Sequence, residues 1–167
     1  RYVGRVQFGH LPPEASLTSA VLFLPKSREL TEYLLHSLAA LPGLQRLFLV
    51  GEKKAGIERA AKQLQQLGKS WKLDSARHCQ LWQCELDDSA KQALRQDWQQ
   101  SFAVQLPQGQ LELCSLPGVF SHGRLDLGTA LLLEHLEGLP AGHWLDFGCG
   151  VGVIGAALKL QHPQAEV

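Results

Sequence analysis

Twelve residues near the C-terminal end, from Trp144 to Gly155, constrain the fold of this chain more than any other segment. A short apolar run leads through Asp146 into glycines at every second position, and apolar residues with helical spacing follow. Glycine permits positive φ and has no Cβ that would keep a ligand away from the backbone. The first N–H groups of a following helix can bind that ligand. The segment therefore predicts a strand, a glycine turn and a helix that together admit a ligand.

The composition is that of a globular protein without a charge bias. Of 167 residues, 45% are hydrophobic, and 16 Lys and Arg balance 16 Asp and Glu. A strongly electropositive domain is excluded, although a local basic face is not. No run approaches the ~18 apolar residues of a membrane span, and the run at 20–24 is too short for a signal peptide. We therefore expect a cytoplasmic protein with no membrane partner.

The four cysteines and seven histidines predict neither a disulfide framework nor a metal site. No C-x₂-C pair occurs and the histidines are scattered, which favours reduced thiols and no bound metal. The sequence holds no Met and begins with Arg1, so we expect a piece of a longer protein. We expect that piece to be a monomer.

The first half alternates short apolar runs with helical patterns. The runs at 21–24 and 47–50 predict buried strands. One helix is predicted to begin after Ser27, as its N-cap, and to stop at 42–43, where Pro and Gly follow each other. A second helix is predicted over about residues 56–67. This β-α-β-α order predicts an α/β fold with a parallel sheet.

The second half predicts a second α/β unit. The expected elements are strands around a turn over 70–86, a short helix or irregular linker over 89–98, a β-hairpin over 105–116, an amphipathic helix over 126–136 and a strand at 144–146. We place the domain boundary near 101–110, which divides the chain into 1–105 and 106–167.

The residue before the glycines decides between ligands. Gly150, Gly152 and Gly155 match the dinucleotide pattern G-x-G-x-x-G. Asp146, however, stands two residues before Gly148 and would aim a carboxylate into the crevice, which suits a positive group better than a pyrophosphate. S-adenosylmethionine carries an ammonium and a sulfonium and no phosphate. A nucleotide-dependent oxidoreductase is therefore disfavoured, and a glycine turn without any ligand is the remaining alternative.

Several spaced blocks carry a resemblance to a known family. Asp146–Gly152 resembles motif I of the class I S-adenosylmethionine-dependent methyltransferases. The blocks Leu24–Lys26, Val50–Glu52, Asp74–Cys79, Leu116–Ser121, Leu125–Gly128 and Leu131–Leu133 resemble ribosomal small-subunit guanine-N2 methyltransferases of the RsmC type. Large-subunit guanine methyltransferases of the RlmG type share the Val-Phe-Ser and motif I blocks, and Asp74–Cys79 favours the first family.

The resemblance implies a Rossmann-like methyltransferase fold, with a degenerate, non-catalytic N-terminal copy followed by the first part of a catalytic copy. It implies S-adenosylmethionine-dependent methylation of a guanine N2 in 16S ribosomal RNA, with the small ribosomal subunit as partner. The cofactor-binding residues that it implies by position are Asp146, Gly148, Cys149, Gly150, Phe120 and Ser121.

The resemblance also implies that the catalytic residues are missing from this sequence. The acidic residue for the ribose and the Asn-Pro-Pro-Phe type motif for the target amine would lie beyond Val167, so we expect the chain alone to be inactive. Asp126 is expected either to cap a helix or to contact the cofactor, with the cap at least as favoured.

Basic residues around the second predicted helix suggest a contact with RNA. They are Lys53, Lys54, Arg59 and Lys62. Neutralisation of phosphates by Lys and Arg dominates RNA binding. Glu52 and Glu58 dilute this charge, so a solvated helix face is the alternative. A second function, from a different class, is a non-catalytic RNA-binding or scaffolding module.

Overall fold

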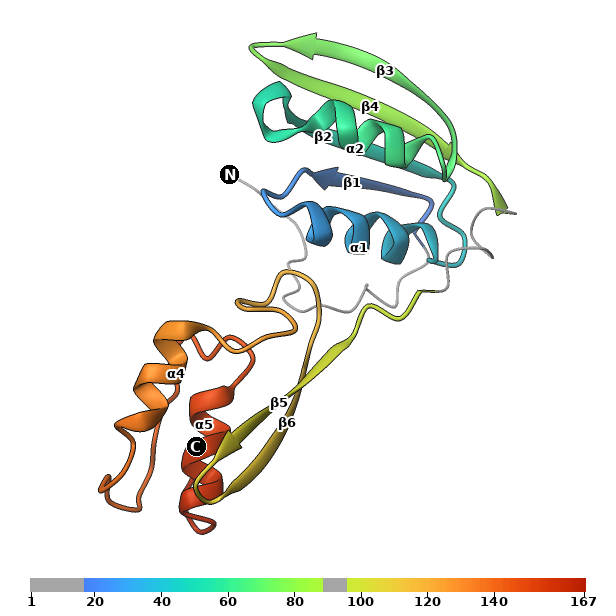
Figure 1. The fold of residues 1–167 in the computed structure, drawn as a ribbon. Coiled ribbons are helices and arrows are strands. Elements are labelled where there is room, and N and C mark those ends of the chain that lie inside the picture. Colours follow the sequence, from blue (N-terminus) through green and yellow to red (C-terminus); the bar gives the residue numbers. More distant parts are fainter. Residues whose placement is uncertain (1–16, 89–95) are drawn as a thin grey trace. The chain divides into compact units, whose positions relative to one another are not determined.

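A computed structural model describes residues 17–88 and 96–167 (Figure 1). The chain divides into two compact units, and the division falls between Gln96 and Asp97. Most of the helix or linker expected over 89–98 lies outside the described residues.

The first unit is built on a four-stranded sheet in the order β1-β2-β4-β3 (Figure 1). β1 (Ser19–Phe23) and β2 (Arg46–Glu52) run parallel, because α1 (Arg28–Ala39) carries the chain back between them. The strands expected at 21–24 and 47–50 are thus confirmed.

The other two strands of this sheet are antiparallel. β3 (Gly68–Ala76) and β4 (Cys79–Leu86) form a hairpin, and β4 pairs with β2 in the antiparallel sense. The connection is only Arg77 and His78, both with positive φ, and so short a turn permits only an antiparallel return. The sheet is therefore mixed and not parallel throughout.

Two helices cover one face of this sheet. Ser27 caps α1 as expected, since its hydroxyl oxygen accepts a hydrogen bond from the Leu30 N–H at 3.2 Å. A short 3₁₀ turn at Lys53–Ala55 precedes α2 (Ile57–Leu64). Helices and strands share one apolar core, made of Leu22, Leu35, Ala39, Leu47, Leu49, Ile57, Ala60, Leu64, Leu67 and Cys84. One common core means that α1 and α2 lie on the same side of the sheet.

The second unit begins with a hairpin of β5 (Gln100–Leu106) and β6 (Gly109–Ser115). The helices α4 (Leu127–Glu134) and α5 (Val153–Gln161) pack with it. The core of this unit consists of Val104, Leu106, Leu113, Val153 and Ala157.

Two expectations for this unit are wrong. The segment 144–146 is not a strand, because its pairing is confined to one parallel bridge between His143 and Glu166, and a ladder needs several paired residues. The helix α4 is not amphipathic. It buries no residue, and Leu127 and Leu131 are exposed while Leu133 packs against the core.

Candidate functional site

The three alternating glycines form an open turn before α5. Gly148, Gly150 and Gly152 have φ of 77°, 58° and 80°, the left-handed region that glycine occupies without strain. A Cβ atom added to Gly148 or Gly152 would meet no other atom within 4 Å. Gly152 is also the N-cap of α5, and no side chain caps that end. The turn thus presents backbone to open space at the start of a helix.

Asp146 is fixed to the first turn of α5. Its Oδ2 atom accepts a hydrogen bond from the Gly155 N–H at 3.0 Å. A carboxylate at this end of a helix is favoured by the helix dipole. Among the described residues, none donates a hydrogen bond to its other oxygen, Oδ1. The side chain therefore has one anchored oxygen and one that is available to a ligand.

The segment after β6 lies against the glycine turn. A Cβ added to Gly150 would lie 3.6 Å from both the Cβ and the carbonyl oxygen of Phe120. The Phe120 side chain remains 67% exposed, and Ser121 has a φ of 60°. The structure therefore brings Phe120 to Gly150, although the two residues are thirty positions apart in the sequence. Among the described residues, no hydrogen bond joins Ser121 to the glycines of the turn, and the Cys149 side chain is exposed.

Ser115 and His122 hold this segment and were not singled out by the sequence analysis. The buried Ser115 hydroxyl accepts a hydrogen bond from the Gly123 N–H at 3.1 Å and lies 2.7 Å from His122 Nδ1. A small hydroxyl at the end of a strand and a Ser-His-Gly turn were the only signals in the sequence.

Asp126 acts as a helix cap. Its Oδ2 atom accepts a hydrogen bond from the Thr129 N–H at 3.1 Å, the contact of an N-cap residue with the third residue of α4. Of the two roles considered for Asp126, the contact observed is the structural one.

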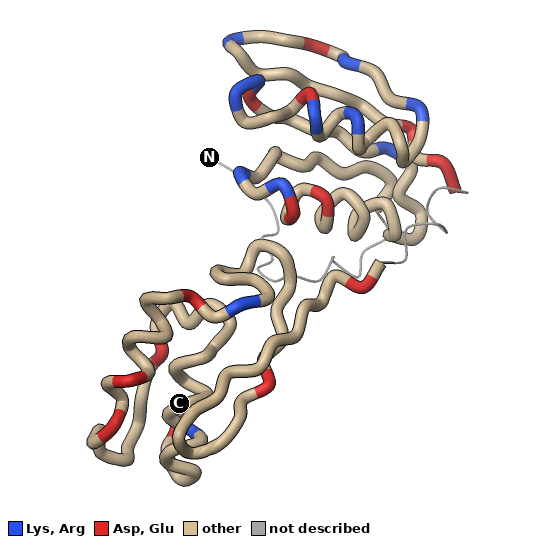
Figure 2. The backbone as a smooth tube through the Cα atoms, in the orientation of Figure 1, with Lys and Arg blue, Asp and Glu red and all other residues tan. Residues whose placement is uncertain are grey.

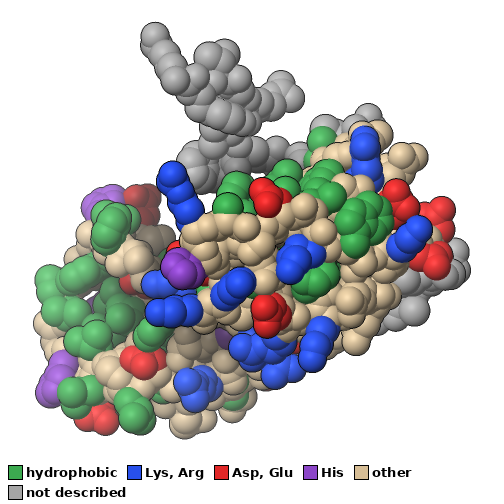
Figure 3. All heavy atoms as spheres, turned by 90° about the horizontal axis from the view of Figure 1, so that it is seen from above, with side chains coloured by type: hydrophobic (Ala, Val, Ile, Leu, Met, Phe, Trp, Pro, Cys, Tyr) green, Lys and Arg blue, Asp and Glu red, His purple; other side chains and the backbone are tan. Residues whose placement is uncertain are grey.

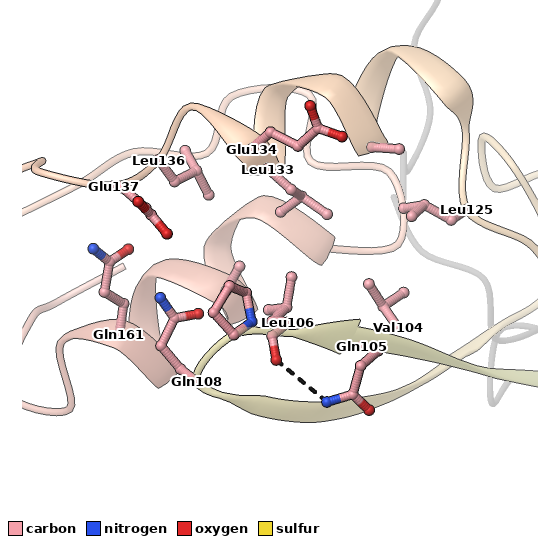
Figure 4. Close-up of a pocket in the computed structure, with 13 residues that line it drawn as sticks. Val104, Gln105, Leu106, Gln108, Leu125, Leu133, Glu134, Leu136, Glu137 and Gln161 are labelled. Carbon is pink, nitrogen blue, oxygen red and sulfur yellow. Dashed lines mark hydrogen bonds between the residues drawn. The ribbon is translucent and has the colours of Figure 1, made fainter.

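A separate groove of about 390 Å³ lies at the other end of α5 (Figure 4). It is lined by Val104, Gln105, Leu106, Pro107, Gln108, Leu125, Ala130, Leu133, Glu134, Leu136, Glu137, Ala157 and Gln161. Figure 4 shows leucines inside it and the polar ends of Glu134, Glu137 and Gln161 around it. None of the glycine-turn residues lines this groove, so the groove is separate from the candidate site.

The basic residues of the first unit lie on and before α2. Lys53 and Lys54 form the 3₁₀ turn, and Arg59 and Lys62 stand one turn apart on α2, all four exposed. Figure 2 shows this basic stretch along α2, where acidic positions are fewer.

Residues 17–88 and 96–167 include neither a helix that could span a membrane nor a cluster of side chains that could hold a metal ion. No helix there has the length and apolar character to cross a bilayer. No group of three or more His, Cys, Asp or Glu side chains is placed there to hold a metal ion.

The α/β layers and the glycine turn before α5 define a Rossmann-like methyltransferase fold. Residues 2–102 match the family described as methyltransferase small domain N-terminal, and residues 110–167 match the methyltransferase small domain. The first of these matches spans more than half of the chain, so the chain belongs to the family described as methyltransferase small domain N-terminal.

Curated relatives agree with the family. The chain is 60% identical to ribosomal RNA small subunit methyltransferase C of Stutzerimonas stutzeri (strain A1501), covering 100% of this chain and 50% of that protein. It is 59% identical to the protein of the same name from Pseudomonas putida KT2440, with the same coverage. The chain thus spans about half the length of the curated relatives it matches. The resemblance to the RsmC type is confirmed.

A solved structure is similar as well. It is the T. Thermophilus 16S rRNA N2 G1207 methyltransferase (RsmC) in complex with AdoMet and guanosine. The two share 29% identity and superpose with a TM-score of 0.59, over 72% of this chain and 33% of the other.

Proposed function

We propose that this chain serves the S-adenosylmethionine-dependent methylation of a guanine N2 in small-subunit ribosomal RNA. The observation that carries the proposal is the open turn at Gly148–Gly152, with Asp146 held at the start of α5 and Phe120 against Gly150. The turn lies within the residues that match the methyltransferase small domain. The relatives of the chain are named as methyltransferases of small-subunit ribosomal RNA.

The residues of the turn fit such a cofactor. A Cβ at Gly148 or Gly152 would point into unfilled space, so the missing side chains leave a cradle over the helix N-terminus. The free Oδ1 of Asp146 supplies the negative charge that an ammonium or sulfonium group needs. The exposed Phe120 ring offers an apolar surface beside it. S-adenosylmethionine, when bound, supplies a methyl group on a positively charged sulfur.

This chain's own part in the reaction is to bind and to orient. Asp146 would hold the positive end of the cofactor while its bond to Gly155 fixes the carboxylate. Gly148, Cys149 and Gly150 would line the cradle with backbone groups, and Phe120 and Ser121 would cover it. Positioning of two reactants supplies much of the rate in such a transfer. We propose no catalytic base among the residues of this chain.

The test joins this chain to the remaining half of the Stutzerimonas stutzeri relative. This chimera should transfer a labelled methyl group from S-adenosylmethionine to 16S ribosomal RNA in small subunits, and the product nucleoside should be N2-methylguanosine. The unmodified relative is the positive control. Large subunits serve as the second substrate, because a transfer to 23S RNA alone would favour the large-subunit alternative. An inactive chimera beside an active control contradicts the proposal.

We also propose that the two units have different functions. In the first unit, β2 is followed by a 3₁₀ turn with two lysines and not by a glycine cradle. This supports a non-catalytic first domain that contacts RNA through Lys53, Lys54, Arg59 and Lys62. The β5–β6 hairpin and the division of the chain between Gln96 and Asp97 support a second, cofactor-binding domain, which then begins earlier than the boundary expected between residues 105 and 106.

The first unit also favours a second candidate function, that of a non-catalytic RNA scaffold. The first unit has a hydrophobic core of its own, so its sole role would then be that of a scaffold that positions RNA. A chain that binds ribosomal RNA but whose chimera binds no S-adenosylhomocysteine would support this alternative.

A further inference from the structure

The carboxyl ends of β1 and β2 lie at one edge of the sheet in the first unit. Ligands of open α/β sheets bind outside this edge. A shallow cavity of about 30 Å³ lies there, between the segment that follows β1 and the start of α2. It is lined by Leu24, Pro25, Lys26, Arg28, Thr31, Ala55, Gly56, Arg59, Ala60 and Gln63. Every charged residue of this lining is a cation: Lys26, Arg28 and Arg59.

Arg59 is held in an electrostatically unfavourable place. A Cβ added to Gly56 would lie 3.2 Å from a terminal nitrogen of the Arg59 guanidinium, so this group lies over the turn that starts α2. Gly56 is the N-cap of α2, and no side chain caps that end. The positive end of a helix dipole repels a cation. An anion bound between the two would remove the repulsion.

The carboxylate in the first turn of α2 is hydrogen-bonded to another side chain. Glu58, in the first turn of α2, accepts a hydrogen bond from Gln80 Nε2 at 3.1 Å. Gln80 is buried on β4, and its own oxygen accepts a hydrogen bond from Trp82 Nε1 at 2.8 Å. Glu29 and Glu52 also lie near this edge, but neither lines the cavity. Among the described residues, no carboxylate forms an ion pair with Arg59, Arg28 or Lys26.

Further cations continue the same edge. The Lys53 N–H donates a hydrogen bond to the His78 carbonyl oxygen at 2.9 Å, which places the β3–β4 turn and its Arg77 beside the 3₁₀ turn. Figure 2 shows basic positions at this end of both helices, and Figure 3 shows Lys and Arg side chains recurring over the face in view. We call this surface the basic edge, and it consists of Lys26, Arg28, Lys53, Lys54, Arg59 and Arg77.

We propose that the basic edge binds the RNA backbone, with one phosphodiester group held among Lys26, Arg28 and Arg59. The cavity is far smaller than the roughly 300 Å³ at which small-molecule pockets begin, so it suits a single phosphate group and not a whole nucleotide. A single guanidinium can pair with a phosphate through two parallel hydrogen bonds, and both Arg28 and Arg59 line this cavity. This inference rests on the proposed function, because it assumes an RNA substrate.

Two matched double variants test the proposal. K26Q/R59Q removes one lysine and one arginine from the basic edge. R46Q/K69Q removes the same charges from exposed positions at the opposite end of the sheet, where Arg46 and Lys69 both pair with Glu85 in the strand register. The probe is a fluorescein-labelled, single-stranded 20-nucleotide RNA, followed by anisotropy over a range of KCl concentrations, and circular dichroism checks that each variant is folded.

K26Q/R59Q should weaken RNA binding about tenfold and lower the slope of log K against log salt by about 1. R46Q/K69Q should weaken it less than twofold. Equal losses in both variants, or no loss in K26Q/R59Q, would overturn the inference. Displacement of the RNA by millimolar AMP would also overturn it, because the edge would then take free mononucleotides.

The proposed function is measured separately. Binding of S-adenosylhomocysteine to the chimera, followed by calorimetry, should not change with K26Q/R59Q. If the wild-type chimera binds none, the methyltransferase proposal fails while the RNA result at the basic edge stands on its own.

Discussion

The Oδ2 atom of Asp146 accepts a hydrogen bond from the backbone N–H of Gly155, nine residues later and at 3.0 Å. This bond closes the glycine turn, because it joins the residue before the turn to the third residue of α5. One oxygen of the side chain thereby serves the helix, while the other accepts no hydrogen bond from the described residues. The two roles can be separated by substitution.

Asp146→Ala and Asp146→Asn should differ in stability but agree in cofactor binding. Alanine removes the acceptor for Gly155, and the loss of such a helix-end bond costs about 1 kcal/mol of unfolding free energy. Asparagine keeps an acceptor oxygen and should cost less than half as much. Both remove the negative charge and should weaken S-adenosylhomocysteine binding to the chimera at least tenfold. Urea unfolding and calorimetry measure the two effects. Wild-type affinity in D146N would show that Asp146 is only a helix cap.

Gly148→Ala should affect ligand binding beyond its effect on stability. Alanine at a φ of 77° is strained by about 1 kcal/mol, and its methyl group would enter the open space above the turn. Gly138→Ala is the matched control, since Gly138 has a φ of 81° and also faces open space, but lies outside the turn. Thermal unfolding should show similar losses for both variants. Only G148A should abolish S-adenosylhomocysteine binding in the chimera, and equal binding by the two would contradict the cradle.

Local signals in the sequence predicted the first unit well. Ser27 before a helical pattern and the apolar runs at 21–24 and 47–50 are features whose cause lies within a few residues. The prediction of a strand at 144–146 failed because a strand needs a partner strand to pair with. The observed pairing there is a single bridge between His143 and Glu166. The prediction that α4 is amphipathic failed for a similar reason. Some of its leucines are exposed and one packs against the core, and the spacing of leucines in the sequence does not show which are which.

The candidate site was predictable in its composition and not in its contacts. The alternating glycines and Asp146 could be named because their residue types are unusual at that spacing. The contact of Phe120 with Gly150 could be placed only by resemblance, since nothing local joins residues thirty positions apart. The Ser115–His122 pair was missed because an ordinary serine at a strand end carries no signal until its partner is seen.

The first unit should lose stability as the pH falls below about 6.5. Burial lowers the pKa of His36 from 6.5, and the charge of Glu32 opposes this effect only in part. In the unfolded chain His36 takes up a proton near pH 6.5, whereas in the folded unit it does so at lower pH. The unfolded state therefore binds more protons in this window, and the stability that neutral His36 contributes is complete above pH 6.5 and lost below it.

The measurement for His36 is urea unfolding of the chain and of His36→Gln between pH 5 and 8. Carboxylates titrate in both proteins at the lower end of this range, so the difference between the two curves isolates the histidine. Wild type should lose more stability than H36Q between pH 7 and pH 5.5. Parallel curves for the two proteins would refute the assignment.

Cys84 should be the one described thiol that stays unreactive in the folded chain. Burial, with a smaller effect of Glu85, raises the pKa of Cys84 from 9.0 to about 11, and its Sγ lies 3.5 Å from the Leu64 carbonyl oxygen. Only the thiolate attacks a disulfide reagent. At pH 8 the exposed Cys114 and Cys149 should react rapidly with Ellman's reagent, the half-buried Cys79 more slowly, and Cys84 only after unfolding.

The same shift predicts a stability change at high pH. A pKa that is raised in the folded state gives stability that is complete below the unfolded value of 9.0 and lost as the pH rises toward about 11. Cys84→Ala has no thiol to ionise, so its stability should change less between pH 8 and pH 10 than that of the wild type. Four equally fast thiols in the folded chain, or the same pH dependence in C84A, would show that the Cys84 side chain on β4 is not enclosed beneath α2.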